Sequence, residues 1–532
     1  MVLFLLLQIN SFQTYLGHKT ADFLSTKLNT SVQIGSIEFG FYKRLIVNDV
    51  YIQDLHKDTI FYSKKLKFAL DKIDAETHEI RVKDVMLLNT KSKIIKYAAD
   101  DDFNFQFIID SLDSGPKTTK KTSTSWKLKF GEVTFVNGDF SYKNEHDTLI
   151  TTGINYFDLR TKNINGLFTD IEINHDTIRG SINYLSAIEK SGFILKNMSS
   201  YVRVSPIEIQ LDELKITTPE SKIATDLSFK YSRYRDFLDF VNKVKFSGEF
   251  ERSELELNDI SYFAPDLYGI FERLNVTGKI SGTVKDLRGK DMNIELGSST
   301  YFKGDVTLTG LPNIEETLIY LSVKNLTTNY KDLSQIPIPP FKSRKKLKVP
   351  ENFKLLGNMS FDGTFTGLYS DFYAYGNFKT ALGMLSSDLA VRYDDEKKIE
   401  LYKGKIKSTA FDFGAFLGAK ALGKATVDVA IKGEGITIEK LKATLDGNVN
   451  SVYFNGYDYQ KIKISGDVAN QIFKGKLNVA DDNIDFDFIG TVDFTNKLPK
   501  LDFISTINKA NLSALHFVNT TKKTNLSTQV II

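Results

Sequence analysis

From about residue 31 to its end, the chain alternates apolar and polar residues with a period of two, as in SVQIGSIEFGF and LIVNDVYIQDL. Successive side chains of a strand point to opposite sides, so this pattern gives each strand one apolar face. Gly, Asn-Gly and Asp-Gly separate the runs and indicate consecutive antiparallel hairpins. An ordinary sandwich would stop after about seven to nine strands, whereas here the pattern continues. The sequence therefore predicts a mainly β fold with a long antiparallel sheet; several separate sandwiches are the alternative.

Composition excludes several function classes. Apolar residues make up 42% and aromatic residues 12%, enough for a core. The 69 basic and 66 acidic residues leave a net charge of +3, which gives no electrostatic footprint for nucleic acid. Because cysteine is absent, disulfides, thiol nucleophiles and cysteine-bound zinc are excluded. That absence fits a cytosolic protein or a periplasmic protein without disulfides.

The N-terminus is the best helical candidate. The run MVLFLLLQI is shorter than the ~20 residues that a membrane-spanning helix needs, and it lacks the basic region of a secretory signal. It is interpreted either as the end of a truncated membrane anchor or as a buried first turn of a soluble domain. Residues 9–28 follow as an amphipathic helix. Its apolar positions recur at three- and four-residue spacings: Phe12, Tyr15, Leu16, Phe23, Leu24 and Leu28.

Proline and small polar residues divide the chain. Residues 1–30 form the apolar stub and helix, and residues 31–113 a first β segment. The polar stretch 114–125 and the Pro/basic stretch 336–350 are predicted linkers, since proline cannot donate to a sheet ladder. The remaining predicted parts are β segments at 126–335 and 351–532, with short helices near 234–244, 258–274 and 411–423.

Residues 126–142, WKLKFGEVTFVNGDFSY, carry the only tryptophan. The Asn137–Gly138 pair predicts a two-residue hairpin turn that would place Phe135 opposite Phe140. A second hairpin is predicted at 474–494, with Ile484, Phe486 and Phe488 on one face.

The residues offer little material for catalysis. None of the six histidines is spaced as a metal-ligand pair, and no phosphate-binding or nucleophile motif occurs. The acidic stretches 97–103, 393–398 and 479–487 fall where turns or outward strand faces are expected, so solvated turns explain them better than an acid pair or a calcium loop. We therefore predict no catalytic residue, no metal site and no cofactor.

The order of segments resembles the TamB (translocation and assembly module) group of the AsmA-like superfamily, in its Bacteroidetes-type form. An apolar stub and a helix lead into FLSTKLNTSVQIGSIEFGFYKRLIVNDVYIQDLHKDTIFYSKKLKF (23–68), and the Trp126 stretch matches the family's W-x-ϕ-x-ϕ strand followed by NGxϕxY. Further similar segments are IEKSGFILKNMSS (188–200), LDELKITTPESKI (211–223), YFAPDL (262–267), TYFKGDVTLTGLPNIEET (300–317) and GYDYQKIKISGD (456–467).

The resemblance implies a curved sheet that forms a taco-like apolar groove. It implies a protein anchored in the inner membrane of a Gram-negative bacterium and facing the periplasm. There it would conduct phospholipid acyl chains, or assist outer-membrane protein assembly with a BamA-like barrel. The sequence departs from the family in its short anchor and in lacking the family's C-terminal domain, which would meet the barrel.

The leading hypothesis is therefore a membrane-tethered scaffold that conducts lipid and is not an enzyme. Its candidate groove residues are Trp126, Leu128, Phe130, Val133, Phe135, Phe140, Tyr142, Ile484, Phe486 and Phe488. For each of them ordinary sheet core is the alternative. A chaperone-like platform that receives barrel strands at its sheet edges is a second hypothesis, and a glycan-active β-solenoid enzyme with a converging acid pair is a third.

Overall fold

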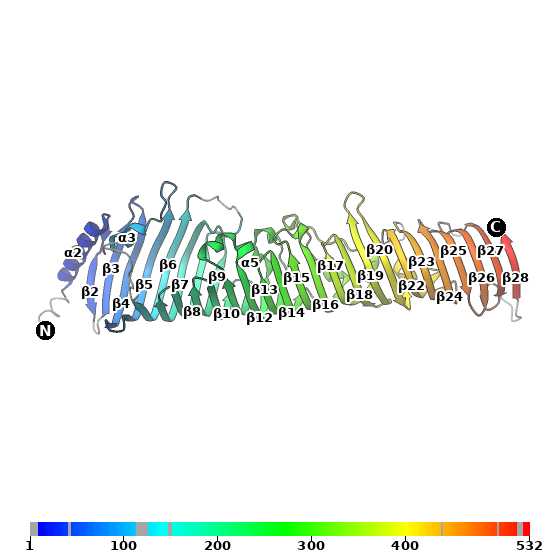
Figure 1. Ribbon diagram of the computed structural model, residues 1–532, viewed down its shortest axis with the longest axis horizontal. Helices are drawn as coiled ribbons and strands as arrows, with labels where there is room; N and C mark the ends of the chain where they lie inside the picture. Colours follow the sequence, from blue (N-terminus) through cyan, green and yellow to red (C-terminus); the bar gives the residue numbers. More distant parts are fainter. Residues whose placement is uncertain are drawn as a thin grey trace. The chain divides into compact units, whose positions relative to one another are not determined.

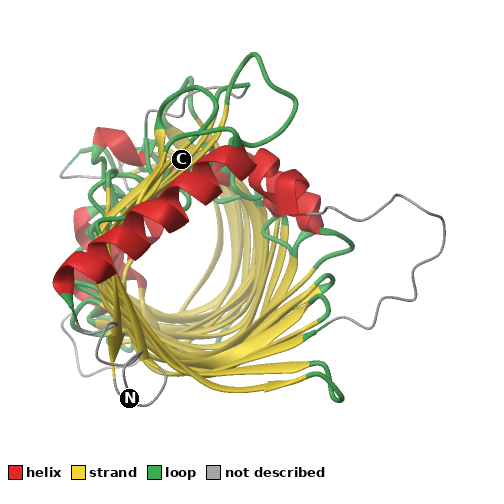
Figure 2. Ribbon diagram, turned by 90° about the vertical axis from the view of Figure 1, so that its left-hand side faces the viewer, coloured by secondary structure: helices red, strands yellow, loops and turns green. Residues whose placement is uncertain are grey.

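The computed structural model describes residues 9–40, 44–112, 126–146, 152–437, 440–496, 500–518 and 525–531. These residues divide into two compact units, 1–284 and 285–532. Both are mainly β, and in each the strands form a curved sheet that does not close (Figures 1 and 2). The predicted stub 1–8 and the predicted linker 114–125 lie outside the described residues.

Unit 1 begins with a long helix, as predicted, and continues with strands (Figure 1). Its elements are α2 (Asn10–Leu28), β1 (Val32–Gln33), β2 (Ser36–Gly40), β3 (Arg44–Gln53), β4 (Thr59–Asp74), β5 (Glu79–Lys96), α3 (Gln106–Leu112), β6 (Lys127–Asn144), β7 (Asp158–Asn174), β8 (Thr177–Glu189), β9 (Ile194–Ser205), β10 (Glu208–Thr217), β11 (Lys222–Lys230), η1 (Tyr234–Asp239), α4 (Phe240–Lys243), β12 (Lys245–Glu256), α5 (Leu257–Ser261), η2 (Pro265–Leu267) and β13 (Arg273–Gly282). Pro265 occupies the first turn of η2, where its missing N–H costs nothing.

Unit 2 repeats the same kind of sheet. Its elements are β14 (Asp286–Leu296), β15 (Thr300–Thr309), η3 (Ile314–Glu316), β16 (Leu318–Asn329), α6 (Tyr330–Leu333), η4 (Phe341–Ser343), η5 (Glu351–Leu356), β17 (Asn358–Gly367), β18 (Asp371–Thr380), β19 (Gly383–Asp394), β20 (Ile399–Thr409), β21 (Phe411–Asp412), α7 (Phe413–Leu417), β22 (Leu422–Glu434), β23 (Lys442–Phe454), β24 (Tyr457–Ala469), β25 (Ile472–Ala480), β26 (Ile484–Asp493), β27 (Lys500–Asn511) and β28 (Asn525–Ile531). The predicted hairpin at 474–494 is confirmed as β25 and β26, with Val479 opposite Phe486.

Among the described strands of both units the pairings are antiparallel, mostly between neighbours in sequence, with one exception. Strand β5 pairs with β6 in parallel, with Leu87 beside Phe135. A parallel pair needs a crossover, and the chain between residues 96 and 127, including α3, supplies it. The predicted antiparallel sheet is confirmed, and the β5–β6 pair is a parallel step within it.

The hairpin predicted at Asn137–Gly138 is wrong. Residues 127–144 form one continuous strand, β6, between β5 and β7. Asn137 does take a left-handed conformation, with φ 54°, but it does so in a bulge where the register with β7 shifts. Its side-chain amide donates a hydrogen bond of 2.7 Å to Oδ1 of Asn89 on the neighbouring strand β5. Asn89 also has a left-handed backbone conformation, with φ 49°. Asn-Gly thus marks a positive φ here without a change of chain direction.

The predicted linker 336–350 lies within unit 2. The strands on either side of it, β16 and β17, pair directly, with Asn329 opposite Asn358. Within the excursion Phe341 is buried, and Pro337 bridges to Lys346. The segment is thus an ordered connection between neighbouring strands of one sheet.

Asp332 on α6 ties this region to the turn between β14 and β15. Its carboxylate accepts the N–H of Ser299 at 2.7 Å and the hydroxyls of Ser298 and Thr300 at 3.1 and 3.0 Å. Burial raises the pKa of Asp332, but these hydrogen bonds outweigh it and hold the pKa below its usual value.

Candidate functional site

The sheet of unit 2 has one face that is apolar from strand to strand. Directly opposite residues point to the same side, so the strand register assembles cross-strand rows. One row is Phe365, Ala374, Leu389, Gly404, Ile431, Leu445, Gly466, Gly475, Gly490 and Phe503. A second is Gly367, Phe372, Val391, Tyr402, Gly433, Ala443, Val468, Phe473, Val492 and Leu501. A third is Gly363, Gly376, Ser387, Ile406, Val429, Gly447, Ile464, Leu477, Phe488 and Ser505.

These three rows, called here the apolar face of unit 2, contain no Asp, Glu, Lys or Arg. The row displaced by one residue points to the other side and is polar: Thr366, Tyr373, Ala390, Lys403, Lys432, Thr444, Asp467, Lys474, Thr491 and Asp502. A one-residue shift thus separates an uncharged surface from a charged one.

The apolar face is the concave one. Side chains on the inside of a curved sheet converge and shield each other, whereas those on the outside spread apart. Phe488 on the apolar face is 6% exposed, while its neighbour Ile489 on the opposite face is 51% exposed. Ile504, beside Ile489 on β27, is 49% exposed.

Protein covers only part of this concave face. At one end of the strands Leu356, Met359 and Phe411 form a buried cluster with side chains from α7 and the segment around η5. Further along the strands Leu389, Leu445 and Leu477 are half-buried. Fully packed core residues of a central strand would be shielded from solvent, so these side chains line a surface that stays open to solvent.

Glycine and phenylalanine residues together keep the side chains of the apolar face close to the backbone. A methyl group added at Gly376 would lie 2.6 Å from the ring of Phe361, and one added at Gly466 or Gly475 would lie 2.9 Å from the ring of Phe473. Each ring therefore lies against the backbone of a neighbouring glycine and not upright in the trough. The same packing occurs in unit 1, where the Phe168 ring lies 2.7 Å from such a methyl position at Gly166.

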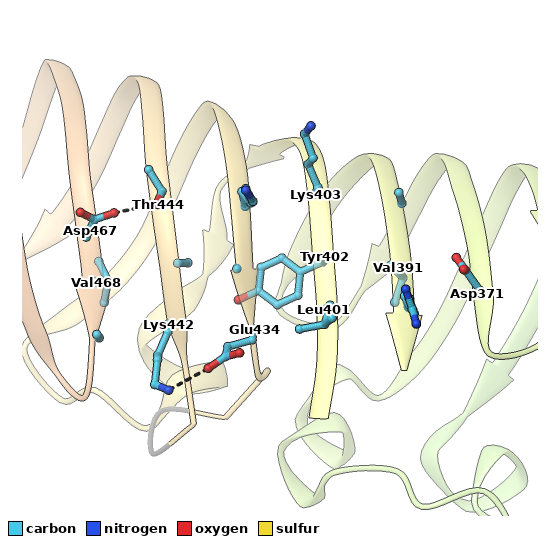
Figure 3. Close-up of a pocket in the computed structure, with 16 residues that line it drawn as sticks. Asp371, Val391, Leu401, Tyr402, Lys403, Glu434, Lys442, Thr444, Asp467 and Val468 are labelled. Carbon is cyan, nitrogen blue, oxygen red and sulfur yellow. Dashed lines mark hydrogen bonds and ion pairs between the residues drawn. The ribbon is translucent and has the colours of Figure 1, made fainter. Parts of the chain in front are cut away.

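A hollow of about 640 Å³ is lined by residues of β18 to β24 (Figure 3). The second row supplies Val391, Tyr402, Gly433, Ala443 and Val468, and the positions one residue to either side supply the others. The Tyr402 hydroxyl donates to the carbonyl of Gly435 at 3.0 Å. Burial, reinforced by the nearby carboxylates of Glu400 and Glu434, raises the pKa of Tyr402 to about 12, so the phenol stays neutral.

Two polar contacts lie among the residues that line the hollow. Lys442 Nζ lies 2.7 Å from Glu434 Oε1, and the Thr444 hydroxyl donates to Asp467 at 2.6 Å (Figure 3). The lining therefore combines the uncharged second row with charged side chains on either side of it, among them Arg392, Lys403 and Lys432.

Unit 1 has an equivalent apolar face. One row joins Phe68, Val85, Val133, Phe168 and Ile182, and the next joins Leu66, Leu87, Phe135, Gly166 and Leu185. A third joins Ile73, Ile80, Leu128, Ile173 and Ile178. Helix α2 packs on this same face at its first strands, since Ala21 belongs to a buried cluster with Ile37 and Val47, against which Leu66 and Phe68 pack.

The structure places nine of the ten candidate groove residues on these faces. In unit 1 they are Leu128, Phe130, Val133, Phe135, Phe140 and Tyr142, and in unit 2 Ile484, Phe486 and Phe488. Phe140 lies on the same side of the sheet as Phe135 despite the bulge. The row of Phe140 leads to Phe61 and the row of Phe135 leads to Leu66, and both of these residues pack on the buried cluster that contains Ala21.

Trp126 is different. It precedes β6, is 41% exposed and makes an edge-on contact with the His78 ring at 5.3 Å. It therefore lies at the end of the strands and not along the floor.

Most of the floor in unit 2, such as Leu445 and Ile464, was missed as candidate site, although the same alternation marks these residues. The signal that could have found them is the combination of alternation with glycine on the apolar side.

The acidic stretches serve turns, as expected. Asp394 accepts the N–H groups of Glu396 and Lys397, and Asp481 accepts the Tyr457 hydroxyl and the N–H of Asn483. Across the described ranges no group of three or more His, Asp or Glu side chains is arranged to hold a metal ion. Within the same ranges, no helix combines the length and the apolar character needed to cross a bilayer.

No family model, curated protein or solved structure matches this chain.

Proposed function

We propose that this protein binds and conducts lipid, with the acyl chains lying in the concave apolar troughs of its sheets. The observation that carries the proposal is the set of three uncharged rows from β17 to β27, whose leucines are half-buried without a covering protein layer. An exposed apolar surface of this extent is rare in a soluble protein unless it has a ligand or a partner.

Acyl chains suit this surface because they need no directional contact. Their burial contributes ~0.8 kcal/mol per methylene group wherever the wall is apolar. A continuous uncharged row also presents equivalent positions to the chain, so a lipid can shift along it without breaking polar contacts. Within the rows themselves, Tyr402 is neutral and no Asp, Glu, Lys or Arg occurs, so the rows hold no charge that would trap a headgroup.

The resemblance to the TamB group of AsmA-like proteins supports the same proposal. On that basis the protein would be tethered to the inner membrane, would face the periplasm and would move phospholipid for outer-membrane biogenesis. A BamA-like barrel is the partner that the resemblance implies.

The test is transfer of a fluorescent phospholipid from donor to acceptor vesicles by the purified chain. We expect Leu445→Asp to reduce the transfer rate, because a carboxylate in the trough must be desolvated when a chain passes. The matched control is Ile489→Asp on the opposite face, which we expect to leave transfer unchanged. A strand-binding scaffold that does not carry lipid predicts no transfer by the parent protein and would overturn the proposal.

A further inference from the structure

Helix α2 packs on the sheet through its smallest residues. Gln13, Gly17, Ala21 and Leu28 are its buried positions. A methyl group added at Gly17 would lie 3.1 Å from the backbone oxygen of Ile34, so the helix approaches the strands at backbone distance. The expectation that the large apolar residues of this helix form its packing face is therefore wrong for several of them.

Two of the large residues that were expected to pack inward, Tyr15 and Phe23, instead face solvent. Phe23 is 64% exposed, Tyr15 is 56% exposed, and Ile9, which immediately precedes the helix, is 50% exposed. At 100° per residue these positions fall within one arc of roughly 120°. The arc, called here the outward stripe, contains Ile9, Phe12, Tyr15, Leu16, Lys19, Phe23, Thr26 and Lys27.

The stripe has the chemistry of a bilayer interface. Aromatic rings and aliphatic side chains alternate with lysines, whose long stems allow the ammonium group to reach the headgroup level. The Lys19 ammonium lies 5.9 Å from the centre of the Tyr15 ring, so charge and ring already share one surface. The remaining exposed arc is polar and includes Ser11, Thr14, His18 and Asp22.

Two further points favour a lipid surface over a protein groove as the occupant. Lys19 and Lys27 lie inside this arc, where their stems can lie along the acyl boundary while the ammonium groups reach anionic headgroups. In the sequence, the helix is preceded by MVLFLLLQ, which carries no charged residue. We propose that α2 lies in the interface of an anionic membrane through its outward stripe. This proposal stands on the exposure of one helix and does not depend on the trough carrying lipid.

The test uses tryptophan as a depth probe in the full chain. In a Trp126→Phe background, Phe23→Trp places the probe in the stripe and Thr14→Trp places it in the polar arc. Both positions are exposed, so neither change disturbs packing. With vesicles of 70:30 phosphatidylcholine and phosphatidylglycerol carrying brominated acyl chains, we expect strong quenching at position 23 and little at position 14.

A second measurement compares vesicle co-sedimentation of variants. We expect the double variant Tyr15→Ser/Phe23→Ser to lower the partition coefficient on the order of tenfold. Tyr375→Ser, which removes a ring that is 58% exposed on β18, is the matched control and should leave it unchanged. Equal quenching at both positions, or none at position 23, contradicts the proposal. So does concentration-dependent self-association that the double variant abolishes while vesicle binding stays unchanged.

Discussion

Placing a carboxylate on the concave face should weaken lipid binding, while the same change on the opposite face should not. Strand β26 carries both sites, because Phe486 lies in the trough and Ile489 lies on the outside with 51% of its surface exposed. Phe486 is half-buried between Val479 and Ile507. We therefore choose Phe486→Asp as the perturbation and Ile489→Asp as its matched control.

The size of the effect follows from the strand spacing. Neighbouring strands lie ~4.8 Å apart, a distance that about four methylene groups span. An acyl chain kept away from one strand therefore forfeits about four methylene contacts, or roughly 3 kcal/mol at ~0.8 kcal/mol each. Since 1.4 kcal/mol corresponds to a factor of ten, lipid affinity should fall about 100-fold.

The assay is titration of the purified protein with a phospholipid that carries a fluorophore on its acyl chain. Phe486→Asp should raise the dissociation constant by about 100-fold, and Ile489→Asp should change it by less than about threefold. Circular dichroism of both variants checks that the sheet is retained. Equal affinity of Phe486→Asp and the parent protein, with both folded, would refute the reasoning that the concave face contacts the acyl chains.

Other predictions concern the sheet itself. Gly475→Val should displace the Phe473 ring, since even a methyl group would lie 2.9 Å from it, and should destabilise the local strands by about 1–3 kcal/mol, measured by hydrogen exchange. Asp332→Asn should cost about 1–2 kcal/mol at neutral pH. Because the folded-state pKa of Asp332 is lowered, this contribution is present above its unfolded pKa of 3.8 and is lost as pH falls through the folded value. The difference in thermal unfolding between variant and parent should therefore shrink as the pH is lowered below 3.8. Asn137→Ala should destabilise β6 by about 1–2 kcal/mol through its left-handed φ and its lost hydrogen bond to Asn89, whereas Asn137→Gly should lose only the hydrogen bond; denaturant midpoints compare them.

The alternation of the sequence predicted the fold class well because burial on one face of a strand fixes side-chain parity. The alternation also placed candidates such as Val133, Phe135 and Phe488 on the apolar face. Which face of a strand a side chain occupies depends on its position along the strand and not on the identity of the neighbouring strand. What parity cannot supply is the direction of pairing. The parallel step between β5 and β6 depends on the crossover that contains α3, and no local pattern encodes it.

Asn137 and Phe23 show two other limits. An Asn-Gly pair indicates that a positive φ costs little free energy at this position. Both a tight turn and a bulge need a positive φ, and the prediction assumed the commoner of the two, the turn. For α2, spacing correctly predicted a helix but not which face packs. The face that contains Gly17 packs on the sheet because it allows the helix to approach the strand backbone closely, and Phe23 is therefore exposed to solvent.

The most direct test of the central claim is native mass spectrometry of the chain purified without detergent exchange. The account predicts bound phospholipid on the parent protein and on Ile489→Asp, and its loss from Leu445→Asp. A parent protein that carries no lipid, before and after incubation with phospholipid vesicles, would contradict it.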